Sequence, residues 1–318
     1  MSEQLRPVQT ITVPSEDLLE SLRPLPEGIR AGVWDLAGEP QGLDYGEIDA
    51  VVLPYAAGRN WRQALDRVPG LKMIQAQTTG YDGLPELVAP GVAIASAAGV
   101  HAAGTAELAL TLMLASLRGI DDAVRNAQSG TWSSSRYPGL ADRRVLMVGV
   151  GGIGAAIARR LEPFEVELTR VGTRARTDEH GTVHGTDELV ELARTAEVLV
   201  VITPLTGETR HLIGREVLAA LPDGSLVVNV ARGPVVDTDA LTAEVLSGRL
   251  HAALDVVEPE PLPADHPLWK APNAIITPHV GGNTEAFVPR IQKLLKEQVG
   301  RLARGEEPEN LVRRGPWA

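Results

Sequence analysis

Short apolar runs alternate with amphipathic stretches in two successive series along this chain. In the first 100 residues, the runs that predict strands are 10–13, 30–36, 50–55, 72–77 and 92–96. Helical patterns or loops separate several of these runs. The second series is more regular, and it predicts helices between strands at 144–150, 166–172, 197–203, 225–231, 251–257 and 274–278. Such alternation favours parallel sheets joined by crossovers, and therefore an α/β fold.

Two longer helical patterns flank the second series. The longest, 104–128, is apolar nearly all round in its first half, which predicts burial between layers. A loop rich in serine, glycine and proline follows it at 129–140. We expect the last helix, 286–306, to pack back on the first domain. Because 318 residues are more than one core usually serves, the chain is expected to form two domains.

Composition and charge narrow the classes of function. The formal net charge of −11 argues against nucleic acid and against an anionic membrane as partners, because both favour a basic face. The absence of cysteine excludes disulfides, thiolate nucleophiles and cysteine-based metal sites. The first ten residues have no apolar core of the signal-peptide type, and no run of 18 apolar residues occurs. We therefore expect a cytoplasmic protein.

A glycine turn joins the first strand and helix of the second series. Gly149, Gly151 and Gly154 form the pattern G-x-G-x-x-G, directly after an apolar run and directly before a helical pattern. In this context the first glycine permits the tight turn, the second lets the backbone approach a pyrophosphate, and the third allows close packing of helix and strand. The helix N-terminus then presents free N–H groups to the phosphates. The turn predicts a dinucleotide site.

The acidic residue that usually binds the ribose 2′-hydroxyl is missing from the end of the next strand. That position falls near Gly172, and no carboxylate follows before Asp178. Arg174 and Arg176 offer planar donor groups suited to a 2′-phosphate, and Thr173 offers a hydroxyl. We therefore predict that NADP(H) is favoured, with NAD(H) as the alternative. The competing interpretation is that both arginines are solvated loop charges.

Three polar side chains follow three successive strands of the second series. Arg232 follows the fourth strand, Glu260 lies beyond the fifth, which contains Asp255, and His279 follows the sixth. Ligands of open α/β sheets bind outside the carboxyl ends of the strands, so the three should meet beside the cofactor. Reduction of a 2-oxo acid needs a cation for the carboxylate, a hydride donor and a proton donor. Arg232 fits the first role and His279 the last, with Glu260 orienting the imidazole and raising its pKa.

Four ordered segments carry a resemblance to a known family. "GVGGIG", "NVARGPVVD", "ALDVVEPEPLP" and "TPHVGGNTEA" are similar to signature segments of the D-isomer-specific 2-hydroxyacid dehydrogenases. The likeness extends from "TTGYDGLPEL" to the last of these segments and is weak in the first 60 residues. The resemblance implies an NAD(P)-dependent oxidoreductase that acts on the CH–OH group of donors. Within the family, "PLPADHPLWKAPN" resembles reductases of glyoxylate and hydroxypyruvate, with Trp269 as a candidate wall of the substrate pocket.

The resemblance also assigns residues where motifs match. Arg232, Glu260 and His279 match the catalytic triad, and Arg232 and His279 also bind substrate, together with the backbone of Thr79 and Gly80. Asp255 matches a carboxylate that faces the nicotinamide amide. The remaining positions matched to the cofactor are Gly152 and Ile153 at the pyrophosphate, Thr203, Pro204 and Thr209 beside the adenosine, Val230 and Ala231 beside the nicotinamide, and Thr105.

The family's architecture is implied as well. It consists of two Rossmann-like domains with doubly wound parallel sheets and a deep interdomain cleft. Residues 1–100 with 285–318 would form a flavodoxin-like substrate-binding domain, and 101–284 the dinucleotide-binding domain. A homodimer is expected through the cofactor domain, with helix 104–118 and the loop around Trp132 as contacts. Three residues depart from the family pattern: Val257 replaces a frequent phenylalanine, Gly172 replaces the usual aspartate, and His101 stands where asparagine is common.

Two other functional classes use a similar glycine turn. A regulatory protein that senses a dinucleotide on the same fold could retain all three polar residues, but the acidic charge and the use of nearly the whole chain by two domains argue against it. A methyltransferase that binds an adenosyl ligand at the glycine turn would give Arg232, Glu260 and His279 no shared chemical role. A metal site is not predicted, because His180 and His184 lack an intervening glutamate and a helical pattern. We interpret these as loop histidines, and His211, His251 and His266 as packing or solvent residues.

Overall fold

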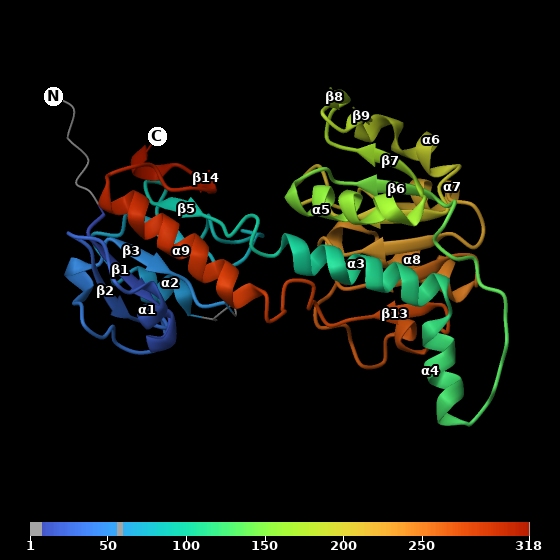
Figure 1. The fold of residues 1–318 in the computed structure, drawn as a ribbon, viewed down its shortest axis with the longest axis horizontal. Helices are drawn as coiled ribbons and strands as arrows, with labels where there is room; N and C mark the ends of the chain where they lie inside the picture. The colour runs from blue at the N-terminus through green and yellow to red at the C-terminus, as the bar shows by residue number, and fades with distance from the viewer. Residues whose placement is uncertain (1–7, 56–59, 318) are drawn as a thin grey trace. The chain divides into compact units, whose positions relative to one another are not determined.

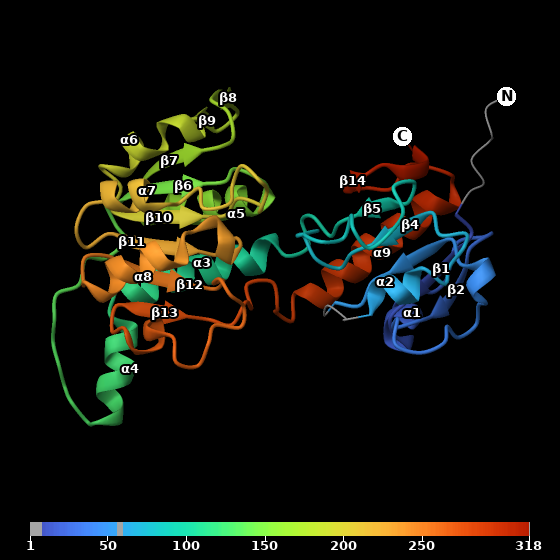
Figure 2. The same ribbon diagram turned by 180° about the vertical axis from the view of Figure 1, so that it is seen from behind.

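The computed structural model describes residues 8–55 and 60–317, and within these the chain forms two compact units. One unit comprises the described residues of Met1–His101 and Glu285–Ala318, and the other Ala102–Thr284 (Figures 1 and 2). The absence of a signal peptide was inferred from the first ten residues, and residues 1–7 of these lie outside the described residues. Both units contain mainly parallel sheets, as predicted, and the α/β class is confirmed.

The first unit has a six-stranded sheet in the order β14-β5-β4-β3-β1-β2, in which only β14 runs antiparallel to its neighbour. Successive residues of its strands alternate between two cores. Ala50 and Val52 pack with α1 and α9, whereas Val51 faces the core that contains Leu65 of α2. The elements are β1 (Thr10–Val13), α1 (Glu16–Leu22), β2 (Arg30–Val33), β3 (Ala50–Val52), α2 (Trp61–Leu65), β4 (Met73–Gln75), β5 (Ala93–Ala95), α9 (Phe287–Ala303) and β14 (Leu311–Arg313), with 3-10 turns at Tyr45–Glu47 and Gly315–Trp317.

The second unit has a six-stranded sheet of parallel strands in the order β13-β12-β11-β10-β6-β7. Helices α3 and α5 cover one face, and α6, α7 and α8 cover the other. The strands are β6 (Arg144–Val148), β7 (Glu167–Val171), β10 (Val198–Val201), β11 (Leu226–Asn229), β12 (His251–Leu254) and β13 (Ala274–Ile276). The helices are α3 (Ala102–Leu117), α4 (Ile120–Gln128), α5 (Gly152–Leu161), α6 (Leu189–Ala193), α7 (Arg215–Ala220) and α8 (Thr238–Leu246), with 3-10 turns at Glu162–Phe164, Thr186–Glu188, Gly233–Val235 and Pro267–Lys270.

The order of the second sheet fixes where a ligand would bind. From β6 the chain moves to β7 on one side and then returns to β10 on the other, so the direction of winding changes between β6 and β10. Ligands of doubly wound sheets bind at the carboxyl ends of the strands beside such a switch point. The glycine turn follows β6, and Thr203 lies shortly after β10, so both belong to this point.

The structure corrects the prediction of one helix over 104–128. The segment forms α3 and α4, which are bent by 65° about Gly119. Gly119 adopts φ +60, and a Cβ there would collide with the ring of Tyr137. In Figure 1, α4 extends away from the sheet of its own unit. No single helix of the described residues is long and apolar enough to cross a membrane.

Every predicted strand except 10–13 was too long, and three short strands were missed. The fifth strand of the second series ends at Leu254, so Asp255 lies just after it rather than within it. The fourth ends at Asn229, so the predicted 225–231 also extends beyond its strand. The missed strands are β14 and the antiparallel hairpin of β8 (Arg176–Asp178) and β9 (Gly181–Val183).

Candidate active site

The glycine turn has the geometry of a phosphate cradle. Gly149 adopts φ +117, and a Cβ there would lie 2.5 Å from the carbonyl oxygen of Ile202. A Cβ at Gly154 would collide with the carbonyl of Gly149. At Gly151 and Gly152, by contrast, a Cβ would meet nothing within 4 Å. The turn is therefore tight on its inner side and open above the N-terminus of α5, where no side chain caps the helix. These features fit the pyrophosphate of a dinucleotide.

The other residues matched to the cofactor lie in the loops after β10 and β11 or near the N-termini of α5 and α3. Thr209 Oγ1 donates to the carbonyl of Pro204 at 2.6 Å and accepts from Thr206 N at 2.7 Å, which closes the loop after β10. Val230 and Ala231 are buried directly after β11. Ile153 is half-buried on α5, and Thr105 is buried on α3 close to Gly281.

The segment after β7 differs from the expected open loop. Gly172 is followed by exposed Thr173 and Arg174, and Arg176 begins the β8–β9 hairpin. Within residues 8–55 and 60–317, neither arginine forms an ion pair; Arg176 Nη1 donates weakly to the carbonyl of Arg174 at 3.4 Å. Both guanidinium groups are therefore available to an anion.

Arg232 lies in the loop that joins β11 to a short 3-10 turn. Its side chain is half-buried, and Nη1 donates to the carbonyl of Ala231 at 2.7 Å. The loop is shaped by Asn229, whose Nδ2 donates to the carbonyl of Arg232 at 3.1 Å and whose Oδ1 accepts from Ala231 N at 3.0 Å. Sequence analysis assigned no role to Asn229, although its place at the end of a buried strand was a signal.

Glu260 and His279 form a direct pair. His279 Nδ1 and Glu260 Oε2 are 2.8 Å apart, and Glu260 Oε1 accepts from Val257 N at 3.1 Å. The hydrogen bond that His279 donates to Glu260 raises the pKa of His279 above its ordinary value, against burial and the charge of Arg232, which lower it. Burial acts to raise the pKa of Glu260, but the contacts with His279, Val257 and Arg232 bring it below its ordinary value. Arg232, Glu260 and His279 follow the neighbouring strands β11, β12 and β13 at one edge of the sheet, and the charge of Arg232 lowers the pKa of both partners.

This arrangement can bind an anion and supply a proton. Nδ1 of His279 is held by the carboxylate, which leaves Nε2 of the same ring, on a side chain 46% exposed, as the atom that exchanges a proton with a ligand. Arg232 supplies the positive charge for a carboxylate or carbonyl oxygen. A nicotinamide cofactor, when bound, would supply the hydride.

The carboxylate of Asp255 accepts hydrogen bonds from the segment that follows β13. Its Oδ1 accepts from Thr277 Oγ1 at 2.6 Å and from Val280 N at 2.9 Å, and its Oδ2 accepts from Gly281 N at 2.8 Å. Its backbone carbonyl accepts from His279 N at 2.8 Å. The side chain is buried, so Asp255 holds the loop that carries His279. Thr277 is a second residue that sequence analysis missed.

The predicted substrate residues of the first unit lie in the loop after β4. Thr79 Oγ1 donates to the carbonyl of Ala97 at 3.3 Å, and Thr78 Oγ1 donates to the carbonyl of Gly80 at 2.7 Å. Both Thr79 and Gly80 are half-buried. His101 is buried in the same unit, where its ring stacks on Phe287 with centroids 5.1 Å apart.

The other histidines lie outside this arrangement. His184 Nδ1 is 2.9 Å from Glu188 Oε2, and His211 Nε2 is 3.3 Å from Glu258 Oε2. In the part of the chain that the structure describes, no group of three histidine or carboxylate side chains is arranged to hold a metal ion. Trp269 is about half exposed, and its Nε1 donates to the carbonyl of Pro263 at 2.9 Å.

Comparisons with known proteins identify the family. The family model for the D-isomer specific 2-hydroxyacid dehydrogenase, NAD binding domain, matches residues 110–281. A glyoxylate reductase of Thermofilum pendens is 33% identical over 261 residues, which are 79% of this chain and 77% of that protein. The chain therefore belongs to the D-isomer specific 2-hydroxyacid dehydrogenases, which are oxidoreductases acting on CH–OH donors, and the predicted family is confirmed.

Two solved structures extend the comparison to nearly the whole chain. A D-isomer specific 2-hydroxyacid dehydrogenase from Xanthobacter autotrophicus Py2, solved with NADPH and MES, has a TM-score of 0.81 and 30% identity, and the match covers 98% of this chain and 100% of that one. The NADPH-dependent glyoxylate/hydroxypyruvate reductase of Sinorhizobium meliloti, solved with NADP and malonate, has a TM-score of 0.79 and 28% identity, covering 97% and 98%. These relatives give no support to the regulatory alternative, and NAD(P) binding follows from the family.

Proposed function

We propose that the chain reduces a small 2-oxo acid, glyoxylate or hydroxypyruvate, to the D-2-hydroxy acid, with NADPH as the favoured cofactor. The observation that carries the proposal is the Glu260–His279 pair, whose atoms Oε2 and Nδ1 are 2.8 Å apart. The charge of Arg232 lowers the pKa of His279, and the pair lies at the same edge of the sheet as the glycine turn. Related proteins named glyoxylate reductase, and a neighbour solved with NADP and malonate, support the substrate class and the cofactor.

The residues divide the chemistry between them. Arg232 binds the carboxylate and polarises the carbonyl of the 2-oxo acid, with the backbone at Thr79 and Gly80 as further donors. Bound NADPH supplies the hydride. His279 donates a proton from Nε2 to the oxygen that becomes the hydroxyl, and Glu260 stabilises the imidazolium and fixes the ring. In this proposal, residues 101–284 bind the dinucleotide, and 1–100 with 285–318 bind the substrate.

The proposal includes a cytoplasmic homodimer. The exposed apolar side chains near the predicted contact belong to α4 and the loop after it rather than to α3, whose apolar residues are largely buried in the core of their own unit. Ile120 and Val124 are more than half exposed, and Trp132 is 98% exposed. A second copy of the chain would cover them.

A panel of 2-oxo acids tests the function. Steady-state kcat/KM is measured for glyoxylate, hydroxypyruvate, pyruvate and a bulkier aromatic 2-oxo acid, each with NADPH and NADH. We expect the highest values for the first two with NADPH. Tight cofactor binding without turnover of any 2-oxo acid would instead support a dinucleotide-sensing protein, and a strong preference for the aromatic acid would contradict the proposed substrate size.

A further inference from the structure

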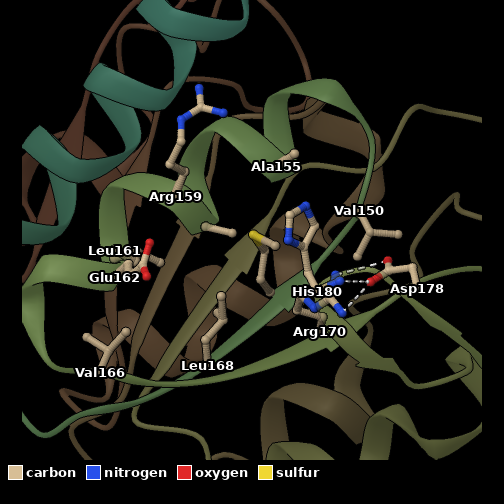
Figure 3. A pocket seen from close by; sticks show the side chains of 12 residues that line it. Val150, Ala155, Arg159, Leu161, Glu162, Val166, Leu168, Arg170, Asp178 and His180 are labelled. Atoms are coloured by element: carbon tan, nitrogen blue, oxygen red, sulfur yellow. Dashed lines mark hydrogen bonds and ion pairs between the residues drawn. The ribbon is translucent and has the colours of Figure 1, made fainter.

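The β8–β9 hairpin is fastened to β7 by a buried arginine. Arg170 projects from β7 at the end of a cavity of about 570 Å³ that α5 and β7 line (Figure 3). Its Nη1 and Nη2 donate to the two carboxylate oxygens of Asp178 at 3.0 and 2.8 Å, and Nη2 also donates to the carbonyl of Thr182 at 3.3 Å. The guanidinium thus binds both strands of the hairpin, and its side chain is only 9% exposed.

Backbone hydrogen bonds also join the end of the hairpin to the end of β7. Gly172 N donates to the carbonyl of His184 at 2.9 Å, and His184 N donates to the carbonyl of Arg170 at 2.8 Å. As a result the hairpin folds over Gly172, the position at which the family usually carries an acid. A Cβ at Gly172 would lie 3.0 Å from Arg176 Nη1 and 3.1 Å from Val183 Cγ1. The guanidinium of Arg176 therefore stands where that acidic side chain would begin.

The acidic side chain of the hairpin is paired, whereas its arginine is available to a ligand. Asp178 is the first carboxylate after Gly172, and both its oxygens are occupied by Arg170, with His180 N donating to Oδ1 at 2.9 Å. These hydrogen bonds, that of Arg170 first, lower the pKa of Asp178 to about 2, so it stays ionised at any working pH. Arg176, in contrast, forms no ion pair with the residues that the structure describes. The pairing neutralises the acid and leaves the neighbouring cation available.

We propose that the Arg170–Asp178 pair is a positioning device for cofactor selectivity: it holds the hairpin so that Arg176 lies against Gly172 and binds the 2′-phosphate of NADPH. The proposal rests on the proposed function, since it specifies how the same cofactor site distinguishes NADPH from NADH. Arg170 and Asp178 do not touch the cofactor and act through Arg176. The pair favours NADPH over NADH because only NADPH carries the phosphate.

Equilibrium titration of the full-length protein with NADPH and with NADH tests this proposal independently of turnover. Asp178→Asn and Arg176→Met should each weaken NADPH binding by about tenfold, the range of one charge-assisted contact, and leave NADH binding within about twofold. The double variant should be no weaker than Arg176→Met alone, because both changes remove the same contact. Arg170→Lys keeps the charge but not the two-pronged geometry, and it should lose part of the NADPH affinity.

Glu244→Gln is the matched control. Glu244 accepts from Arg249 Nε at 2.6 Å in a partly buried pair on α8 of the same unit, so this change also breaks an arginine–carboxylate pair, but away from the hairpin. It should leave both affinities unchanged. Additive losses in the double variant, equal losses for the two cofactors, or tighter NADPH binding in Asp178→Asn would each overturn the proposal, the last because Asp178 would then act by repulsion.

Failure of the proposed function gives a different result. If the wild-type protein binds neither cofactor, the proposed function fails together with this inference. If it binds both with equal affinity and reduces 2-oxo acids, the proposed reaction stands, whereas the preference for NADPH and the role of Arg176 are refuted. If Asp178→Asn does not fold, the Arg170→Lys titration decides, because lysine retains a cation in the buried position.

Discussion

Replacing Gly149 or Gly151 with alanine separates the stability of the glycine turn from its binding function. At Gly149 the backbone has φ +117, and the new Cβ would lie 2.5 Å from the carbonyl oxygen of Ile202 and 2.8 Å from Thr203 N. Neither obstacle is a flexible side chain, so the turn or the end of β10 must move. At Gly151 the φ is −76 and no atom lies within 4 Å of the new Cβ.

The expected magnitudes follow from these surroundings. A strained backbone conformation costs about 1–3 kcal/mol, and forced displacement of packed neighbours costs about 1–3 kcal/mol. Gly149→Ala should therefore lower the free energy of unfolding by roughly 2–6 kcal/mol, which at about 3 °C per kcal/mol for a unit of this size lowers Tm by about 6–18 °C. Gly151→Ala should change Tm by less than about 1 °C but weaken NADPH binding at least about tenfold, because its methyl group occupies the space that the pyrophosphate must approach.

Thermal unfolding followed by circular dichroism gives Tm, and fluorescence titration gives the Kd for NADPH. Gly91→Ala serves as the control, since a Cβ there also meets nothing within 4 Å and the residue lies in the other unit, with no proposed contact with the cofactor. Normal NADPH binding by Gly151→Ala would show that the phosphates do not bind on this turn. An unchanged Tm for Gly149→Ala would show that the close approach to Ile202 does not constrain the fold.

Three further outcomes are expected. Arg232→Ala should lower kcat/KM for the 2-oxo acid by at least about 10²–10³-fold while the Kd for NADPH stays within about twofold, and lost cofactor affinity with normal turnover would contradict the role. Glu260→Gln removes the contact that raises the pKa of His279, so the imidazolium is lost at lower pH and the alkaline limb of the kcat/KM profile for reduction should move to lower pH; an unmoved limb would assign the acid to another group. Trp132→Ala should reduce the proportion of dimer in light scattering after size exclusion, and a monomeric wild-type protein would refute the dimer.

Features that depend on adjacent residues were predictable from the sequence. The glycine turn is one: Gly149 directly follows β6 and Gly154 lies in the first turn of α5, so local spacing suffices to locate them. The apolar runs of the second series also coincide with parallel strands, because strands buried on both faces are apolar throughout. The placement of Arg232 and His279 at one edge followed from the rule that parallel strands end together.

Features that depend on distant partners were not predictable. The β8–β9 hairpin has the polar sequence of a loop, and it is ordered by Arg170 on the preceding strand and by pairing with β7. The 104–128 pattern is helical throughout, yet the helix breaks at Gly119, where the ring of Tyr137 packs against the bare Cα. A pattern of apolar positions does not record which residue from elsewhere in the chain will occupy such a space.

Asp255 shows how a residue assigned to the cofactor can also have a structural role. The family resemblance assigns its carboxylate to the nicotinamide, but the structure gives that carboxylate three donors from residues 277–281. An anion buried after β12 attracts these donors because it would otherwise remain unpaired at a high cost. These hydrogen bonds hold the loop after β13 against the end of β12. His279 adopts φ +53 there, a strained conformation that the hydrogen bonds to Asp255 must stabilise. The orientation of the proposed proton donor therefore depends on Asp255 as well as on Glu260. Asp255→Asn should accordingly lower kcat/KM, which needs His279 in place, more than it weakens the binding of NADPH.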